Sequence, residues 1–153
     1  MIHAFPPFYK KEIYYMSTLQ DLDQLISEWK TDSNEIKKDF LFLKNNLEKK
    51  SNITFDFVSR PGVSYSLRAA HTAQKKRSLF VMVDIIDDEP ENRWLSVCFY
   101  GEMITDPDEK GDLIPGGLLG EDGYCFDHEE GNDADIAYIQ GRIDEAYASA
   151  GKE

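Results

Sequence analysis

The chain of 153 residues is 41% hydrophobic, 12% aromatic and 30% charged, which fits one globular domain and differs from the apolar-poor composition of a disordered protein. Its formal net charge of −12 is unevenly placed, because residues 1–80 hold 13 basic and 9 acidic side chains whereas residues 81–153 hold 4 and 20. Such a field repels nucleic acid and anionic lipid and attracts cations or basic proteins, so we expect no nucleic-acid partner.

Two interpretations of residues 1–15 are open. The segment lacks the apolar core and the small-residue cleavage site of a signal peptide. It is either a non-native extension, because codons for residues 10–12 can spell a ribosome-binding sequence that would make Met16 rather than Met1 the initiator, or a loosely ordered tail whose aromatic side chains pack on the domain. In both cases residues 16–153 are expected to form a single α+β domain.

Two amphipathic helices are predicted next. Ser17 and Gln20 have the spacing of a capping box, and the apolar residues that follow predict a helix over 18–30. A second capping signal at residues 32–35 precedes an apolar stripe that repeats every three or four residues, formed by Ile36, Phe40, Leu43 and Leu47. The two segments form either separate helices or one bent helix.

Alternating apolar residues from Ile53 onward then predict strands. Residues 60–63, Arg-Pro-Gly-Val, place proline and glycine where a type II turn needs them, so strands on either side should form a hairpin. Residues 79–86 are typical of a central strand, and residues 94–100 predict a fourth strand that could extend to Ile104. Four sequential strands with short connections indicate an antiparallel meander.

The remaining chain predicts a long loop and a final helix. Residues 105–132 contain six glycines, two prolines and many acids, so we expect an irregular and functional or mobile segment. An apolar stripe predicts a last helix from about Asp133. The predicted fold is therefore α+β, a four-stranded antiparallel meander with N-terminal helices and a C-terminal helix packed on one face.

The acidic loop resembles a calcium site only in part. Residues 106–112 open like an EF-hand loop with glycine at position 6, but Lys110 and Gly117 break the pattern of oxygen ligands. A looser divalent-cation site is an alternative, and its ligands would come from the loop carboxylates, namely Asp106, Asp108, Asp112, Glu121, Asp122 and Asp127. The simpler interpretation is a solvated acidic loop, so no cofactor is predicted.

Cysteine and histidine offer a second set of metal ligands. Cys125 and His128 have Cys-x-x-His spacing, and Cys98 and His71 would complete a zinc site if the fold brought them together. Structural zinc sites usually show two such pairs, so we prefer a buried Cys98 and a solvated His128. Acidic surroundings also disfavour a nucleophilic thiolate at Cys125.

The cysteine count and hydropathy predict the compartment. Two cysteines are too few for a disulfide-rich secreted scaffold, and no apolar run is long enough to span a bilayer. We therefore expect a cytoplasmic protein that makes no membrane contact.

Arg68 and His71 belong to the one basic cluster of the chain. Together with Tyr65 and Trp94 they could hold a carboxylate or phosphate, although a solvated loop is the simpler interpretation. The uneven charge also permits self-association.

These observations favour a small binding or accessory domain that presents an acidic loop to a cation or a basic protein partner. Two alternatives are a metal-dependent enzyme that uses the loop carboxylates or the Cys125/His128 pair, and an anionic-ligand binder that uses Arg68 and His71. No known catalytic motif is present, so enzymatic activity is not expected.

Overall fold

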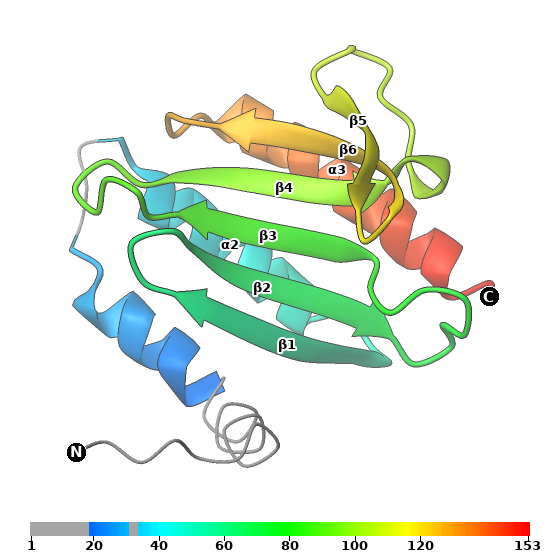
Figure 1. Cartoon of the computed structure of the whole chain (residues 1–153), viewed down its shortest axis with the longest axis horizontal. Helices are drawn as coiled ribbons and strands as arrows, with labels where there is room; N and C mark the ends of the chain where they lie inside the picture. The colour runs from blue at the N-terminus through cyan, green and yellow to red at the C-terminus, as the bar shows by residue number, and fades with distance from the viewer. Residues whose placement is uncertain (1–18, 31–33) are drawn as a thin grey trace.

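The computed structural model describes residues 19–30 and 34–153. It shows an α+β fold built on a six-stranded antiparallel sheet (Figure 1). Residues 19–28 are helical, and a short 3-10 helix, η1, covers Gly101–Met103. The longer helices are α2 (Ile36–Glu48) and α3 (Asp133–Ala150). The strands are β1 (Ile53–Arg60), β2 (Ser64–His71), β3 (Val81–Ile86), β4 (Trp94–Tyr100), β5 (Asp112–Leu118) and β6 (Glu121–His128).

The N-terminal helices are two separate elements. The first ends at residue 28 and the next two residues are not helical, so the alternative of one bent helix is wrong. The predicted capping residue Ser17 and the start of the second capping signal lie outside the described residues. The predicted stripe is confirmed, because Ile36, Phe40, Leu43 and Leu47 are all fully buried on one side of α2.

The predicted hairpin is also confirmed. β1 and β2 pair antiparallel from Ile53 opposite His71 to Arg60 opposite Ser64. Gly62 has a φ of 81°, the left-handed conformation that the third position of a type II turn requires, and the Val63 N–H donates to the Arg60 carbonyl at 2.9 Å. A side chain at position 62 would therefore strain the turn.

The expectation of four strands is wrong, because the segment taken as an irregular loop contains β5 and β6. The sheet order is β1-β2-β3-β4-β6-β5, so β6 pairs with β4 and β5 forms the edge. An edge strand tolerates proline and glycine since one side of its backbone needs no partner, and β5 contains Pro115, Gly116 and a shift in register between Ile114 and Leu118. Its turn-like composition hid the strand.

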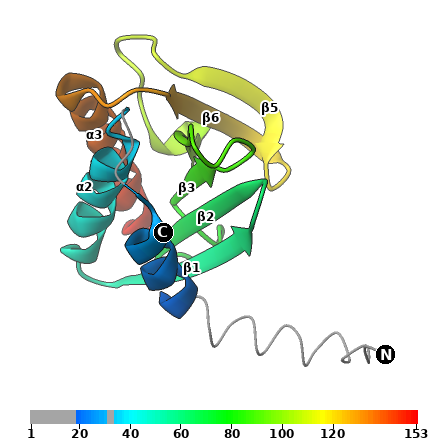
Figure 2. The same ribbon diagram turned by 90° about the vertical axis from the view of Figure 1, so that its left-hand side faces the viewer.

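The sheet has a helix-covered face and an open face. Figures 1 and 2 show α2 and α3 side by side against the same face, where Val83 of β3 and Val97 of β4 are fully buried. On the other face no helix of the described residues lies against the strands, and the β5–β6 hairpin curls toward that side (Figure 2). The period of two along each strand decides which side chains reach this open face.

The final helix begins as predicted. Asn132 caps α3 by accepting a hydrogen bond from the Asp135 backbone N–H at 3.0 Å. Its apolar stripe, Ile136, Ile139, Ile143 and Ala146, is buried. Within the described residues, none of the helices combines the length and the apolar character that a membrane span requires.

Candidate functional site at the end of β6

Acidic side chains gather where β6 ends and α3 begins. A hollow of about 510 Å³ lies at this junction, which the chain crosses in the four residues between His128 and Asp133. Four carboxylates and one lysine are among its lining residues, namely Asp127, Glu129, Glu130, Asp135 and Lys110. The volume lies within the range of roughly 300–1,000 Å³ that is usual for binding pockets.

A buried histidine–aspartate pair forms the base of this junction. His128 Nε2 lies 2.6 Å from Asp39 Oδ2, and both side chains are 3% exposed. The same Asp39 oxygen accepts the backbone N–H of Asn132 at 3.1 Å. One carboxylate on α2 therefore fixes both the end of β6 and the start of α3. The expectation of a solvated His128 is wrong.

Close backbone packing holds the loop between these elements. The Gly131 N–H donates to the Asn34 carbonyl at 2.6 Å. A Cβ at position 131 would lie 2.7 Å from that carbonyl oxygen and 2.7 Å from the Glu35 Cβ, so only glycine fits. Glu129 and Glu130 are exposed on a loop whose end is anchored in this way.

Most of the carboxylates around the hollow are not neutralised. Lys110 pairs with Asp135 at 3.0 Å, and this hydrogen bond raises the pKa of Lys110. Asp127, Glu129 and Glu130 are exposed and form no ion pair with any residue that the structure describes. The pKa of Asp127 is raised, first by partial desolvation and then by repulsion from Asp112 and Glu129. The site therefore favours a positive charge from outside.

The loop that resembles an EF-hand uses its first aspartate internally. Asp106 accepts the backbone N–H groups of Lys110 at 3.1 Å and Gly111 at 2.8 Å, and also the hydroxyl of Tyr138. Burial alone would raise the pKa of Asp106, but these hydrogen bonds and nearby Arg142 hold it below its ordinary value. The Asp108 N–H donates to the Tyr138 hydroxyl at 3.1 Å. Asp106 thus closes its own loop and anchors it to α3.

The two cysteines lie opposite each other on β4 and β6. Cys98 is the register partner of Cys125, and a disulfide joins them. Cys98 is 8% exposed, so the expectation that it is buried is confirmed. His128 is three residues beyond Cys125 on the same strand, which places the two side chains on opposite faces of the sheet. The structure does not bring Cys125 and His128 together.

The predicted ligand-binding residues are likewise divided between the faces. Arg68 and Trp94 lie on the open face, but on β2 and β4 at positions four residues out of register. Tyr65 and His71 lie on the helix-covered face, where Tyr65 stacks on Phe57 and the His71 ring contacts Tyr147. These four residues do not form one site.

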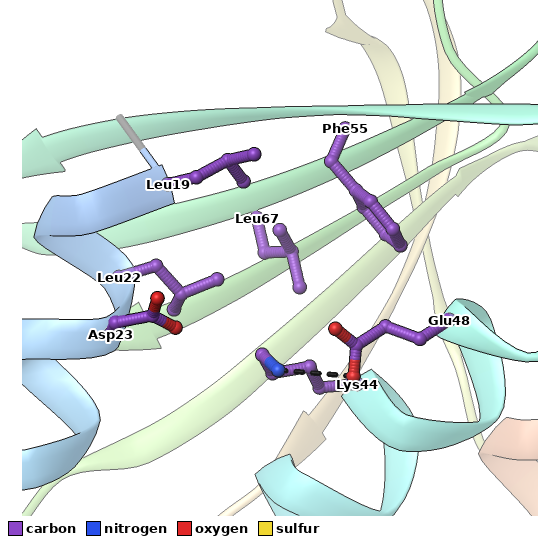
Figure 3. Close-up of a pocket in the computed structure, with 7 residues that line it drawn as sticks. All are labelled: Leu19, Leu22, Asp23, Lys44, Glu48, Phe55 and Leu67. Atoms are coloured by element: carbon purple, nitrogen blue, oxygen red, sulfur yellow. Dashed lines mark hydrogen bonds and ion pairs between the residues drawn. The ribbon is translucent and has the colours of Figure 1, made fainter. Parts of the chain in front are cut away.

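A smaller hollow lies between the first helix and the sheet. It has a volume of about 140 Å³, and Leu22, Phe55 and Leu67 form its apolar wall (Figure 3). The ion pair between Lys44 and Glu48, at 3.1 Å, lies at its rim. This volume is below that of a typical ligand pocket.

Among residues 19–30 and 34–153, no group of three or more histidine, cysteine, aspartate or glutamate side chains is arranged to hold a metal ion.

The sequence did not reveal the Asp39–His128 pair, because 89 positions separate its members. Glu129 and Glu130 were also missed, although their positions two and three residues after Asp127 were a usable signal. Comparison with protein-family models, curated proteins and solved structures finds no match to this chain.

Proposed function

We propose that this protein is a binding or accessory domain whose acidic hollow at the end of β6 receives a lysine- or arginine-rich segment of a protein partner. The observation that carries the proposal is the set of unpaired carboxylates around a hollow of about 510 Å³. Carboxylates that repel one another raise the free energy of the isolated domain, and a cationic partner would offset that cost.

The global charge supports the same role. With a net charge of −12, the domain attracts basic proteins over distances of about a Debye length. The hollow then provides a defined site at which the attracted partner binds. The anchored loop adds to this, because side chains on a fixed backbone lose less conformational entropy on binding.

The test is titration of the protein with a fluorescently labelled oligolysine peptide, followed by anisotropy. The triple variant Asp127→Asn, Glu129→Gln, Glu130→Gln should weaken binding by at least about tenfold, because three charges that converge on one hollow are removed. Affinity for the unmodified protein should also fall as salt is added.

A charge-matched control is available in the turn between β3 and β4. Asp88, Glu89 and Glu91 are exposed, and the variant Asp88→Asn, Glu89→Gln, Glu91→Gln changes the net charge by the same amount. This control should bind oligolysine with nearly unchanged affinity. Equal losses in the two triple variants would show attraction by net charge alone and would contradict the proposed site.

A further inference from the structure

A second hollow lies at the opposite end of β6 from the acidic one. Its volume is about 340 Å³, and it is bounded by β1 and β2 on the open face of the sheet and by the tip of the β5–β6 hairpin. Figure 2 shows how the hairpin curls toward this face. The hollow belongs to neither the acidic junction nor the small apolar site of Figure 3.

Opposite charges face each other here without pairing. Asp56 on β1 is the register partner of Arg68 on β2, and both line the hollow. Such pairs normally interact across a sheet, where partner Cα atoms are about 4.5–5.5 Å apart. Instead, Arg68 Nε donates to Ser66 Oγ at 3.1 Å, and Asp56 Oδ1 accepts the Phe57 N–H at 3.0 Å.

This arrangement leaves charged groups available on both sides of the hollow. Within the described part of the chain, no carboxylate lies in ion-pairing range of Arg68, and its terminal guanidinium nitrogens donate to no residue. Asp56 likewise forms no ion pair with any described residue. An arginine with no carboxylate within ion-pairing distance is suited to a carboxylate ligand, and a carboxylate beside it is suited to an ammonium group.

The tip of the hairpin supplies an apolar wall. Leu119 lines the hollow with a φ of 50°, a left-handed conformation that leucine rarely adopts, and it is 60% exposed. The tip is held in place because the Arg77 side chain, 8% exposed, binds Glu121 at 2.9 Å and Glu102 at 3.0 Å. Leu119 and Gly120 both have positive φ, as the two central residues of a type I′ hairpin turn between Leu118 and Glu121 require, so the turn itself holds an exposed leucine beside the hollow.

From these contacts we infer that the hollow binds a small zwitterion with an apolar side chain, the chemistry of a free aliphatic α-amino acid. The carboxylate binds Arg68, the ammonium binds Asp56, and the side chain packs against Leu119. A doubly charged anion such as phosphate fits less well, because Asp56 lies opposite Arg68 and the charge of Arg68 already acts on a second carboxylate, Asp84.

The experiment is calorimetric titration of the full chain with L-alanine, L-valine, L-leucine and L-isoleucine. Saturable binding is expected, and it should be tighter for leucine than for alanine because more apolar surface is removed from water. N-acetyl-L-leucine, which lacks the ammonium, and L-leucinamide, which lacks the carboxylate, should each bind at least about tenfold more weakly. Inorganic phosphate should not compete.

Two results with these probes would overturn the inference. One is the absence of saturable binding for all four amino acids. The other is equal affinity for leucine and either blocked derivative, which would assign the hollow to a peptide end or a simple ion instead.

Variants test the individual contacts. Arg68→Ala should abolish binding and Asp56→Asn should weaken it by at least about tenfold. The control Arg60→Ala removes an exposed arginine of β1 that does not line the hollow, and it should bind like the unmodified protein. Binding that is unchanged in Arg68→Ala would overturn the inference.

A second variant keeps the test valid if Arg68→Ala does not fold. Leu119→Asn lies on an exposed turn, and asparagine tolerates the left-handed backbone there. It should remove the preference for leucine over alanine while alanine still binds. An unchanged preference would overturn the assignment of Leu119.

Discussion

At the scale of single residues, the acidic hollow depends on a contrast between two aspartates. Asp39 is buried, and its oxygen is used by His128 and by the Asn132 backbone. Asp127 is exposed and has no cationic partner among the described residues, so repulsion acts on it. The Asp39 carboxylate stabilises the fold, whereas the Asp127 carboxylate raises the free energy of the folded domain and is available to bind a cation.

The variant Asp127→Asn should therefore stabilise the isolated domain at neutral pH while it weakens binding of oligolysine. A carboxyl whose pKa is raised on folding costs stability when ionised, and asparagine carries no charge. Urea unfolding measured in parallel with the anisotropy titration checks both effects.

The same reasoning predicts how the difference in stability between Asp127→Asn and the unmodified protein depends on pH. The cost is fully present above the pKa that Asp127 has in the folded protein, and it disappears as pH falls through that value toward the pKa of the unfolded chain. The stability of Asp127→Asn and of the unmodified protein should therefore converge in acid. A difference that persists at low pH would show that loss of charge is not the cause.

At the scale of elements, β5 and β6 show where periodicity is informative. β6 does alternate, since Tyr124, Phe126 and His128 face the helices while Cys125 and Asp127 face the open side. Acids and glycines at the remaining positions concealed this pattern. The prediction that Arg68 and His71 share one binding site was wrong for a related reason. The two residues are three positions apart on β2, and successive side chains of a strand point to opposite faces of the sheet.

The disulfide between β4 and β6 should contribute measurably to stability. It closes a loop across 27 positions, for which chain-entropy reasoning gives about 3–4 kcal/mol. Reduction, or the double variant Cys98→Ser, Cys125→Ser, should lower the free energy of unfolding by up to about that amount. Unfolding by urea with and without a dithiol reductant measures the difference.

A matched control for this measurement is the double serine variant with and without reductant, which should show no change. Equal stability of the oxidised and reduced unmodified protein would contradict the prediction. Alkylation of the protein in its native cells, followed by mass spectrometry, would also test the predicted cytoplasmic location, because disulfides are rare in reducing compartments.

At the scale of the whole molecule, the uneven charge of the chain is partly neutralised by folding. Lys50 pairs with Asp144 at 2.7 Å, and Arg77 pairs with Glu102 and Glu121. Basic groups of the first half thus contact acids of the second half within one molecule. Fewer cations remain for head-to-tail contacts between molecules.

We accordingly predict a monomer by light scattering at both low and physiological salt. Lys50 and Arg77, two of the basic side chains that a head-to-tail contact could use, are already paired internally. One of the two edge strands, β5, also has an irregular register that hinders pairing with a second sheet. A dimer that forms at low salt and dissociates when salt is added would contradict this and would support electrostatic self-association.

The sequence by itself determined the local elements: the stripe of α2, the β1–β2 turn, the strands up to β4 and the start of α3. These follow from side-chain periodicity and from turn and cap chemistry, which act over a few residues. The tertiary structure decided the partner of β6, the disulfide, the Asp39–His128 pair and the convergence of carboxylates at one hollow. Such contacts join residues far apart in the chain, so their energies depend on packing and burial that no local pattern encodes.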